Sequence, residues 1–319
     1  MAKRGLPVNG AAGTGRMKFR RLFHTGKQPA MASPRRPTDD RSRTNREGVN
    51  DSGRPKTSLR GREGRMHGGR GSGRGTAGAV RLWGRHAVEA ALTNPERVAK
   101  KLWGTREAIQ AMLDDHDAEL PKSLPIEYAQ AADLGRLVAR DAPHQGLVLD
   151  CAALPDLVLD DALDEAGGRT IVLLDQVTDP HNVGAILRSC AAFDVAALIT
   201  QDRHAPPESG TLAKSASGAL EVVPWVRVVN LARALETIAE AGYWRIALDG
   251  EGKATFPGAL PAGPVALVLG AEGDGIRRNV LDHCDAVARL PISGRIESLN
   301  VSTAAAIALY AASIRDKAE

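Results

Sequence analysis

The spacing of apolar residues changes near residue 80 of this 319-residue chain. Before that point no regular apolar spacing is sustained. After it, short apolar runs alternate with segments in which apolar residues recur every three or four positions. Runs of the first kind are typical of strands, and segments of the second kind are typical of amphipathic helices. Their alternation predicts an α/β fold.

The first part of this alternation predicts a small α/β unit. Thr105 can cap a helix at 106–116, whose apolar residues lie on one face. A polar triplet at 144–146 precedes the last strand of the unit, and a turn that supports the sheet explains it as well as a functional role does. The predicted strands are 80–83, 98–103, 126–129 and 146–151, and the other predicted helices are 86–92 and 132–138.

The second part predicts a doubly wound parallel sheet, because its strands are continuous apolar runs that need cover on both faces. An acidic stretch at 154–168 predicts a short helix that links the two units. The last helix is rich in alanine, so it can approach a neighbouring helix closely. The predicted strands are 170–174, 196–200, 222–228, 244–248, 265–269 and 286–290, and the predicted helices are 183–193, 231–241 and 300–314.

Charge divides the chain at the same point as the apolar spacing. The first 80 residues hold 19 Lys/Arg and 5 Asp/Glu, a balance of +14, whereas the remainder holds 23 and 33, a balance of −10. A basic segment with so few apolar residues cannot bury enough surface to fold, which predicts a disordered tail at 1–79. A loose RNA-binding arm, a plain linker or over-extended gene start, and an organellar transit peptide all fit its composition.

Several protein classes are excluded by the sequence. A membrane helix needs ~18–20 consecutive apolar residues, and no run approaches that length. The cysteines at 151, 190 and 284 are widely separated and form no CxxC, which excludes a disulfide scaffold or a zinc ribbon and fits buried thiols in a reducing compartment. The motifs of P-loop NTPases, zincins and α/β-hydrolases are absent, and no metal site is predicted.

Three loops in the second part carry polar residues that the fold alone does not require. They lie at 175–184, 270–275 and 290–302, each directly after a predicted strand, where α/β proteins bind ligands. A tight turn explains the glycine loop at 270–275 as well as a ligand site does. Helix capping does not account for Asn182 and Arg188 at the first loop, or for Glu297, Ser298 and Asn300 together in the third.

These loops resemble the three motifs of the SpoU (TrmH-type) branch of the SPOUT RNA methyltransferases. Residues 179–184 with Arg188 resemble the first motif, 268–273 resemble the second, and 290–302 resemble the third. Ala271 stands where serine is common in the family. Residues 82–146 are similar to the L30e-like substrate-binding domain found on 23S rRNA guanosine 2′-O-methyltransferases.

The resemblance implies a domain organisation that the residue patterns alone do not reveal. It implies a trefoil-knotted methyltransferase domain at 170–319 that binds S-adenosylmethionine in the knot and works as a homodimer. It also implies an L30e-like RNA-binding domain at 80–153, joined to the knotted domain by a linker at 154–169. The basic tail lies outside the resemblance.

The resemblance further implies methyl transfer to a guanosine 2′-oxygen in large-subunit rRNA. Arg188 is the central catalytic residue on this basis, surrounded by Asn182, Glu272, Ser298 and Asn300. Because the arginine pKa exceeds ~12, we expect Arg188 to donate to an RNA phosphate or the developing alkoxide rather than to act as a base. The positions whose backbone cradles the cofactor are matched by Gly270, Leu290, Ile292 and Leu299.

Two other functions remain open from the sequence. One is the same reaction on tRNA, which the front unit disfavours because tRNA enzymes of this branch typically carry short helical extensions instead. The other is a non-catalytic RNA-binding protein. The expected partners are large-subunit rRNA or a precursor particle and a second copy of the chain, with no membrane. The expected location is the bacterial cytoplasm, with organellar import by the tail as the alternative.

Overall fold

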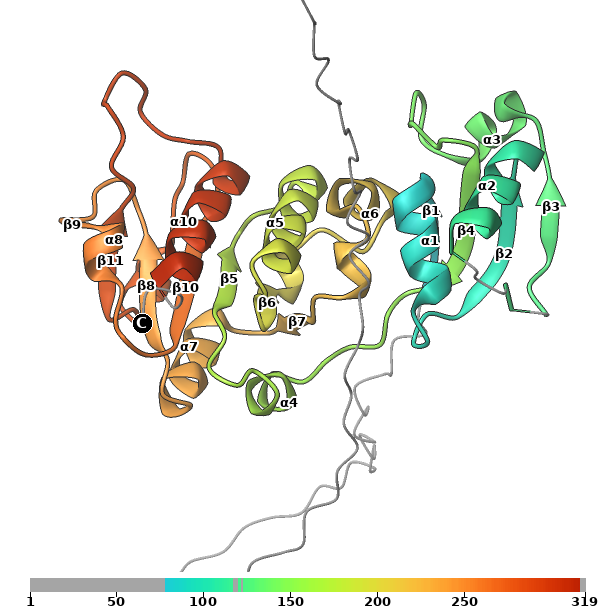
Figure 1. Ribbon diagram of the computed structural model, residues 1–319. Coiled ribbons are helices and arrows are strands. Elements are labelled where there is room, and N and C mark those ends of the chain that lie inside the picture. The colour runs from blue at the N-terminus through green and yellow to red at the C-terminus, as the bar shows by residue number, and fades with distance from the viewer. Residues whose placement is uncertain (1–77, 117–119, 122, 316–319) are drawn as a thin grey trace, which may run out of the picture. The chain divides into compact units, whose positions relative to one another are not determined.

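The structure, a computed structural model, describes residues 78–116, 120–121 and 123–315. The disordered tail predicted for 1–79 therefore lies outside the described residues, except for its last two. The described chain contains two β-sheets, one in each of the two predicted α/β parts (Figure 1).

The front unit is a four-stranded sheet in the order β1-β4-β2-β3 with three helices. Strand β4 is antiparallel to β1 and β2, whereas β3 is parallel to β2. The hydroxyl of Thr105 accepts a hydrogen bond from the Ala108 amide (3.2 Å), which confirms the predicted cap of α2. The elements are β1 (Ala79–Trp83), α1 (Arg85–Thr93), β2 (Ala99–Gly104), α2 (Arg106–His116), β3 (Ile126–Tyr128), α3 (Ala131–Leu137) and β4 (Leu147–Ala152).

The second unit is a seven-stranded sheet in the order β7-β6-β5-β10-β8-β11-β9, and every pair of neighbouring strands is parallel. Its strands are β5 (Ile171–Asp175), β6 (Ala197–Gln201), β7 (Trp225–Val228), β8 (Trp244–Leu248), β9 (Ala254–Thr255), β10 (Val265–Gly270) and β11 (Ala286–Arg289). Its helices are α5 (Pro180–Ala192), α6 (Gly210–Ala216), α7 (Leu231–Glu240), α8 (Phe256–Ala259), α9 (Arg278–Leu281) and α10 (Val301–Arg315), and its 3-10 turns are η1 (Asp202–His204) and η2 (Ala219–Glu221). The predicted linker helix is α4 (Leu159–Asp164).

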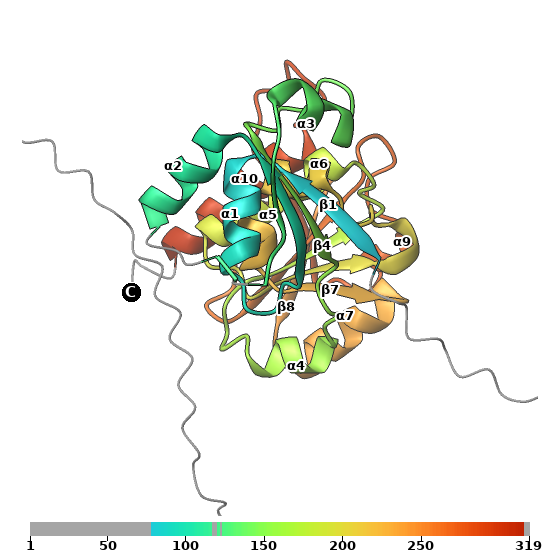
Figure 2. The ribbon, with the colours of Figure 1, turned by 90° about the vertical axis from the view of Figure 1, so that its right-hand side faces the viewer.

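Helices cover both faces of the second sheet, as its apolar strands predict. Successive residues of β5 enter different cores: Ile171 and Leu173 pack in one cluster, and Val172 and Leu174 pack in the other. Helices α5 and α10 lie on one side of the sheet and α7 lies on the other (Figures 1 and 2).

Helices α5 and α10 pack side by side and point in the same direction. Asn182 and Asn300 are hydrogen bonded at the beginnings of the two helices, and the rings of Phe193 and Tyr310 make an edge contact at 6.2 Å near their ends. Ala305, Ala308 and Ala312 of α10 are buried, which confirms the close approach predicted from its alanine content. The amino-terminal ends of both helices therefore lie at one edge of the sheet.

The structure differs from the predicted elements at several places. The strand predicted at 222–228 begins only at Trp225, because 219–221 form a 3-10 turn and Val222 is 52% exposed. Helix α6 follows two prolines, and its residues are mostly small, so no apolar period predicts it. The elements β9, α8 and α9 are also short and were not predicted.

The described cysteines form no disulfide. Cys151 and Cys190 are buried and Cys284 is partly buried, so the predicted burial holds fully for two of the three. In the residues that the structure describes, no helix combines the length and hydropathy needed to cross a membrane.

Candidate functional site

The three polar loops predicted from the sequence meet through Asn182, Glu272 and Asn300. The Glu272 Oε1 atom accepts hydrogen bonds from the amide groups of Asn182 (3.1 Å) and Asn300 (2.6 Å). Asn300 also donates to the side-chain oxygen of Asn182 (3.0 Å). All three side chains keep contact with solvent, so a substrate can reach this cluster, which we call the carboxamide cluster.

Two helix caps hold the carboxamide cluster in place. Asp179 caps α5 by accepting from the His181 amide (2.9 Å), and Asn182 follows in the first turn. The side-chain oxygen of Asn300 accepts from the amides of Ser302 (2.9 Å) and Thr303 (3.2 Å) at the start of α10. Capping therefore occupies the oxygen of Asn300, and its nitrogen is left to reach Glu272.

The glycine loop that carries Glu272 closes on itself. Residues Ala271 and Gly275 exchange backbone hydrogen bonds of 3.1 Å in both directions. A Cβ atom at Gly270 would lie 2.2 Å from the carbonyl carbon of Gly275, so only glycine fits there. The tight turn is thus the observed reason for this glycine.

A partly buried ion pair lies at the same edge of the sheet, and the sequence patterns did not indicate it. Asp175 ends β5 with no exposed surface, and its carboxylate accepts from Arg277 Nε (2.9 Å), Nη2 (2.6 Å) and the backbone amide (2.9 Å). Arg277 also donates to Gln201 at the end of β6 (2.7 Å). A buried aspartate at the end of an apolar strand needs a positively charged partner. The position of Asp175 in the sequence could therefore have indicated this ion pair.

Arg188 and Ser298 do not join the carboxamide cluster. Arg188 comes six positions after Asn182, which turns it by about 240° around α5. Its side chain is exposed and makes no hydrogen bond or ion pair with any residue that the structure describes. Ser298 is exposed in the loop before α10, and its hydroxyl likewise has no partner among the described residues.

The loop that contains the predicted cofactor residues offers unpaired backbone groups and apolar surface. Within the described chain, the backbone of residues 291–299 makes no hydrogen bond to another residue. Ile292 and Ile296 are exposed, while Leu290 and Leu299 are partly buried at the two ends of the loop. Unpaired donors beside apolar side chains allow this loop to contact a ligand that has both apolar and polar groups. The described residues include no cluster of potential metal ligands.

Comparisons with known proteins agree with the resemblance noted in the sequence. Residues 169–310 match the SpoU rRNA Methylase family, and residues 81–157 match the family described as RNA 2′-O ribose methyltransferase substrate binding. The chain is 36% identical over 239 residues to the 23S rRNA (guanosine-2′-O-)-methyltransferase RlmB of Vibrio parahaemolyticus, covering 72% of this chain and 95% of that protein.

Two further comparisons extend this picture. RlmB of Pseudomonas aeruginosa is 36% identical over 237 residues, covering 72% of this chain and 94% of that protein. The crystal structure of the SpoU methyltransferase AviRb from Streptomyces viridochromogenes in complex with the cofactor AdoMet aligns with a TM-score of 0.63 at 23% identity. That alignment covers 76% of this chain and 92% of the AviRb chain, which shows a shared fold.

Proposed function

Because the chain belongs to the SpoU rRNA methylase family, we propose that it methylates the 2′-oxygen of a guanosine ribose in 23S rRNA, using S-adenosylmethionine as methyl donor. The observation that carries the proposal is the carboxamide cluster, which unites the three loops that resemble the family motifs. The substrate follows from the RlmB relatives, which are named for this reaction and align with both units of the chain.

The reaction makes defined demands on the site. The ribose 2′-oxygen bonds to the methyl carbon, the carbon–sulfur bond breaks with its electron pair remaining on sulfur, and the hydroxyl proton leaves. The protein must align the oxygen with the methyl group and help the proton leave. Glu272 uses Oε1 for the two asparagines, and its Oε2 makes no hydrogen bond within the described residues. In our proposal, the carboxamide cluster orients the ribose through the free Oε2 atom of Glu272.

Arg188 has a separate role in this proposal. It donates to an RNA phosphate or to the negative charge that develops on the 2′-oxygen, because its guanidinium cannot serve as a base near neutral pH. A neighbouring group or the RNA phosphate region assists proton removal. Methyl incorporation by Arg188→Lys, compared with Arg188→Ala, tests the role. Near-normal turnover in Arg188→Lys would show that the forked geometry of arginine is unnecessary.

The methyl donor is proposed to bind at the backbone of Gly270, Leu290, Ile292 and Leu299. The unpaired backbone groups of residues 291–299 and the exposed Ile292 side chain support this placement. The donor supplies a methyl group activated by positively charged sulfur. The trefoil knot implied by the resemblance is proposed for 170–319 together with this site.

We also propose that the enzyme works as a homodimer through α10. Ile307, Tyr310 and Ile314 are exposed at spacings of three and four residues, which places them along one side of the helix. A second copy of the chain would cover this apolar stripe. Helix α10 packs on α5, which carries Arg188, so a dimer formed here brings the partner close to that arginine.

The substrate assignment rests on the front unit. We propose an L30e-like RNA-binding domain at 80–153, a linker at 154–169 and an accessory RNA-binding tail at 1–79, acting on rRNA or a precursor particle in the bacterial cytoplasm. Calorimetry tests whether the protein binds S-adenosylmethionine. A folded protein that does not bind it would contradict the proposed methyltransferase activity. Methyl incorporation into purified rRNA and tRNA tests the substrate, and incorporation into tRNA alone would contradict it.

A further inference from the structure

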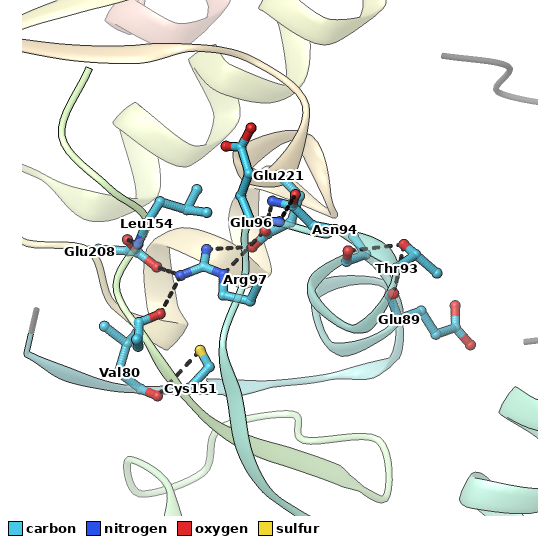
Figure 3. A network of polar contacts seen from close by, with 12 residues as sticks. Val80, Glu89, Thr93, Asn94, Glu96, Arg97, Cys151, Leu154, Glu208 and Glu221 are labelled. Carbon is cyan, nitrogen blue, oxygen red and sulfur yellow. Dashed lines mark hydrogen bonds and ion pairs between the residues drawn. The ribbon is translucent and has the colours of Figure 1, made fainter. Parts of the chain in front are cut away.

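A fully buried arginine joins the front unit to the methyltransferase unit (Figure 3). Arg97, just before β2, has 0% side-chain exposure, and it pairs with Glu221 and Glu208 of the second unit, which are 4% and 9% exposed. Its Nη2 and Nε atoms lie 2.5 Å and 3.2 Å from the two carboxylate oxygens of Glu221. Its Nη1 atom bonds Glu208 and donates to the Ala152 carbonyl (2.9 Å).

The remaining polar atoms of this group are also paired. Asn94 donates to Glu221 (2.7 Å), and the Leu154 amide donates to Glu208 (3.1 Å). Burial disfavours the charge on Arg97, but hydrogen bonds and attraction from Glu221 and Glu208 hold its pKa above the ordinary value. Removing one partner from such a group leaves a buried charge uncompensated. The contacts therefore favour one specific arrangement of the two units.

Apolar packing continues through the same contact. A Cβ atom at Gly210, the first residue of α6, would lie 2.1 Å from the Trp83 ring of β1. A Cβ atom at Gly218 would lie 3.2 Å from the Cβ of Ala90 in α1. Buried residues of α1 and α6 belong to one continuous core cluster, and the described residues of both sheets fall in one compact unit. We call the Arg97 group and this packing the interdomain joint.

Helix α6 connects the interdomain joint to the proposed active site. On one side, Lys214 donates to the side-chain oxygen of Gln145 in the front unit. The same oxygen also accepts from the Arg85 backbone amide (3.2 Å). On the other side, Ser215 is hydrogen bonded to His181 of α5 (3.2 Å). One short helix thus lies between the front unit and the helix that presents Asn182.

We propose that the interdomain joint holds the RNA-binding domain in one orientation against the catalytic domain, and that Arg97 is a positioning residue for rRNA methylation. The inference rests on the proposed function, because it concerns where RNA held by the front unit meets the carboxamide cluster. A fixed orientation raises the effective concentration of the target ribose at the site further than a loosely tethered domain does.

The test compares Arg97→Met with Arg81→Met. Arg81 makes a similar two-pronged ion pair with Asp150 (2.6 Å and 2.9 Å), but both partners belong to the front sheet. We expect Arg97→Met to raise the KM for rRNA at least tenfold while the KM for S-adenosylmethionine stays unchanged. Arg81→Met should change neither value by more than twofold.

Cys151 provides a readout that does not depend on activity. Burial raises the pKa of its thiol to about 12, and it lies beside Arg97 in the interdomain joint (Figure 3). Alkylation at pH 8, mapped by mass spectrometry, should be at least tenfold faster at Cys151 in Arg97→Met than in Arg81→Met. Cys190, buried within α5, is the internal standard and should react equally slowly in both variants.

A second variant opens the interdomain joint without leaving a buried charge. Gly210→Ala pushes a methyl group into Trp83, and we expect the same increases in rRNA KM and Cys151 alkylation. If Arg97→Met does not fold, the rRNA KM and the Cys151 alkylation rate of Gly210→Ala test the proposal instead. Variants that fold and bind S-adenosylmethionine normally, yet match Arg81→Met in Cys151 alkylation and rRNA KM, would overturn the proposal. If no RNA is methylated even by the wild-type chain, the proposed function fails, and the alkylation result still decides whether the joint exists.

Discussion

At the residue scale, Asn300 performs two tasks with the two ends of one carboxamide group. Its oxygen caps α10, and its nitrogen donates to Glu272 and Asn182. An aspartate would supply only acceptors, and a serine would supply a cap without the reach. The choice of asparagine is therefore explained by the two tasks together.

Substitutions at Asn300 separate these tasks. Asn300→Ser keeps an N-cap, so thermal stability should remain near that of the wild type, whereas Asn300→Ala should lose about 1 kcal/mol. Both variants lose the donor to Glu272, and methyl transfer should fall at least about 100-fold in both. Thermal unfolding and methyl incorporation measure the two effects. Activity that follows stability across the pair would contradict a direct role of the carboxamide nitrogen.

Gly270 provides a second test at the residue scale, because its neighbour is the backbone of its own loop. Gly270→Ala should destabilise the protein by about 1–3 kcal/mol and weaken S-adenosylmethionine binding, since the Glu272 loop must move. Gly263→Ala is the control, because a Cβ there meets nothing within 4 Å. Chemical unfolding and calorimetry check both effects. Equal behaviour of the two variants would show that the loop tolerates the added methyl group.

At the element scale, the parallel arrangement of α5 and α10 directs two helix amino-termini toward the carboxamide cluster. Helix amino-termini carry partial positive charge, which favours a phosphate or a developing alkoxide nearby. Gly184 also lets α5 pack closely against α6, because a Cβ atom at Gly184 would lie 2.5 Å from the Leu212 carbonyl oxygen of α6. The site is thus built on helices whose spacing small residues determine.

The exposed side of α10 gives a prediction about assembly. The double variant Ile307→Asp/Ile314→Asp places charges on the apolar stripe and should raise the dimer dissociation constant at least tenfold by sedimentation. Val229→Asp serves as the control, because Val229 is 84% exposed and follows β7, an edge strand of the sheet. A wild-type chain that sediments as a monomer, or a double variant that still dimerises like the control, would contradict the proposed interface.

At the scale of the whole molecule, the sequence predicts local elements well and distant contacts poorly. The helix at 106–116 has the predicted bounds, because its cap and apolar face are local signals. The three site loops were found from polar residues that directly follow predicted strands, but their shared function came only from the family resemblance, since capping and turns explain much of each loop. The Arg97–Glu221 pair spans 124 residues, and no local pattern links its members. Helix α6, which carries the interdomain joint, has too few long apolar residues to show a period.

The charge asymmetry of the chain also acts at this scale. The residues after position 80 carry a net charge of −10, so sequence-independent attraction to RNA falls to the tail, with its balance of +14. Removing residues 1–76 should weaken RNA binding mainly at low salt and leave the methylated nucleotide unchanged. Filter binding over a salt series and 2′-O-methyl mapping check this. A changed methylation site would show that the tail reads RNA structure.

Methylation of a guanosine ribose in large-subunit rRNA by this chain can be tested in one experiment. The most direct measurement incubates the purified full-length chain with S-adenosylmethionine and a mixture of unmodified rRNA and tRNA, and then maps 2′-O-methyl groups at single-nucleotide resolution. We expect one new mark, on a guanosine of 23S rRNA, which Glu272→Gln and Arg188→Ala reduce strongly. A mark confined to tRNA, or no mark from a protein that binds S-adenosylmethionine, would contradict it.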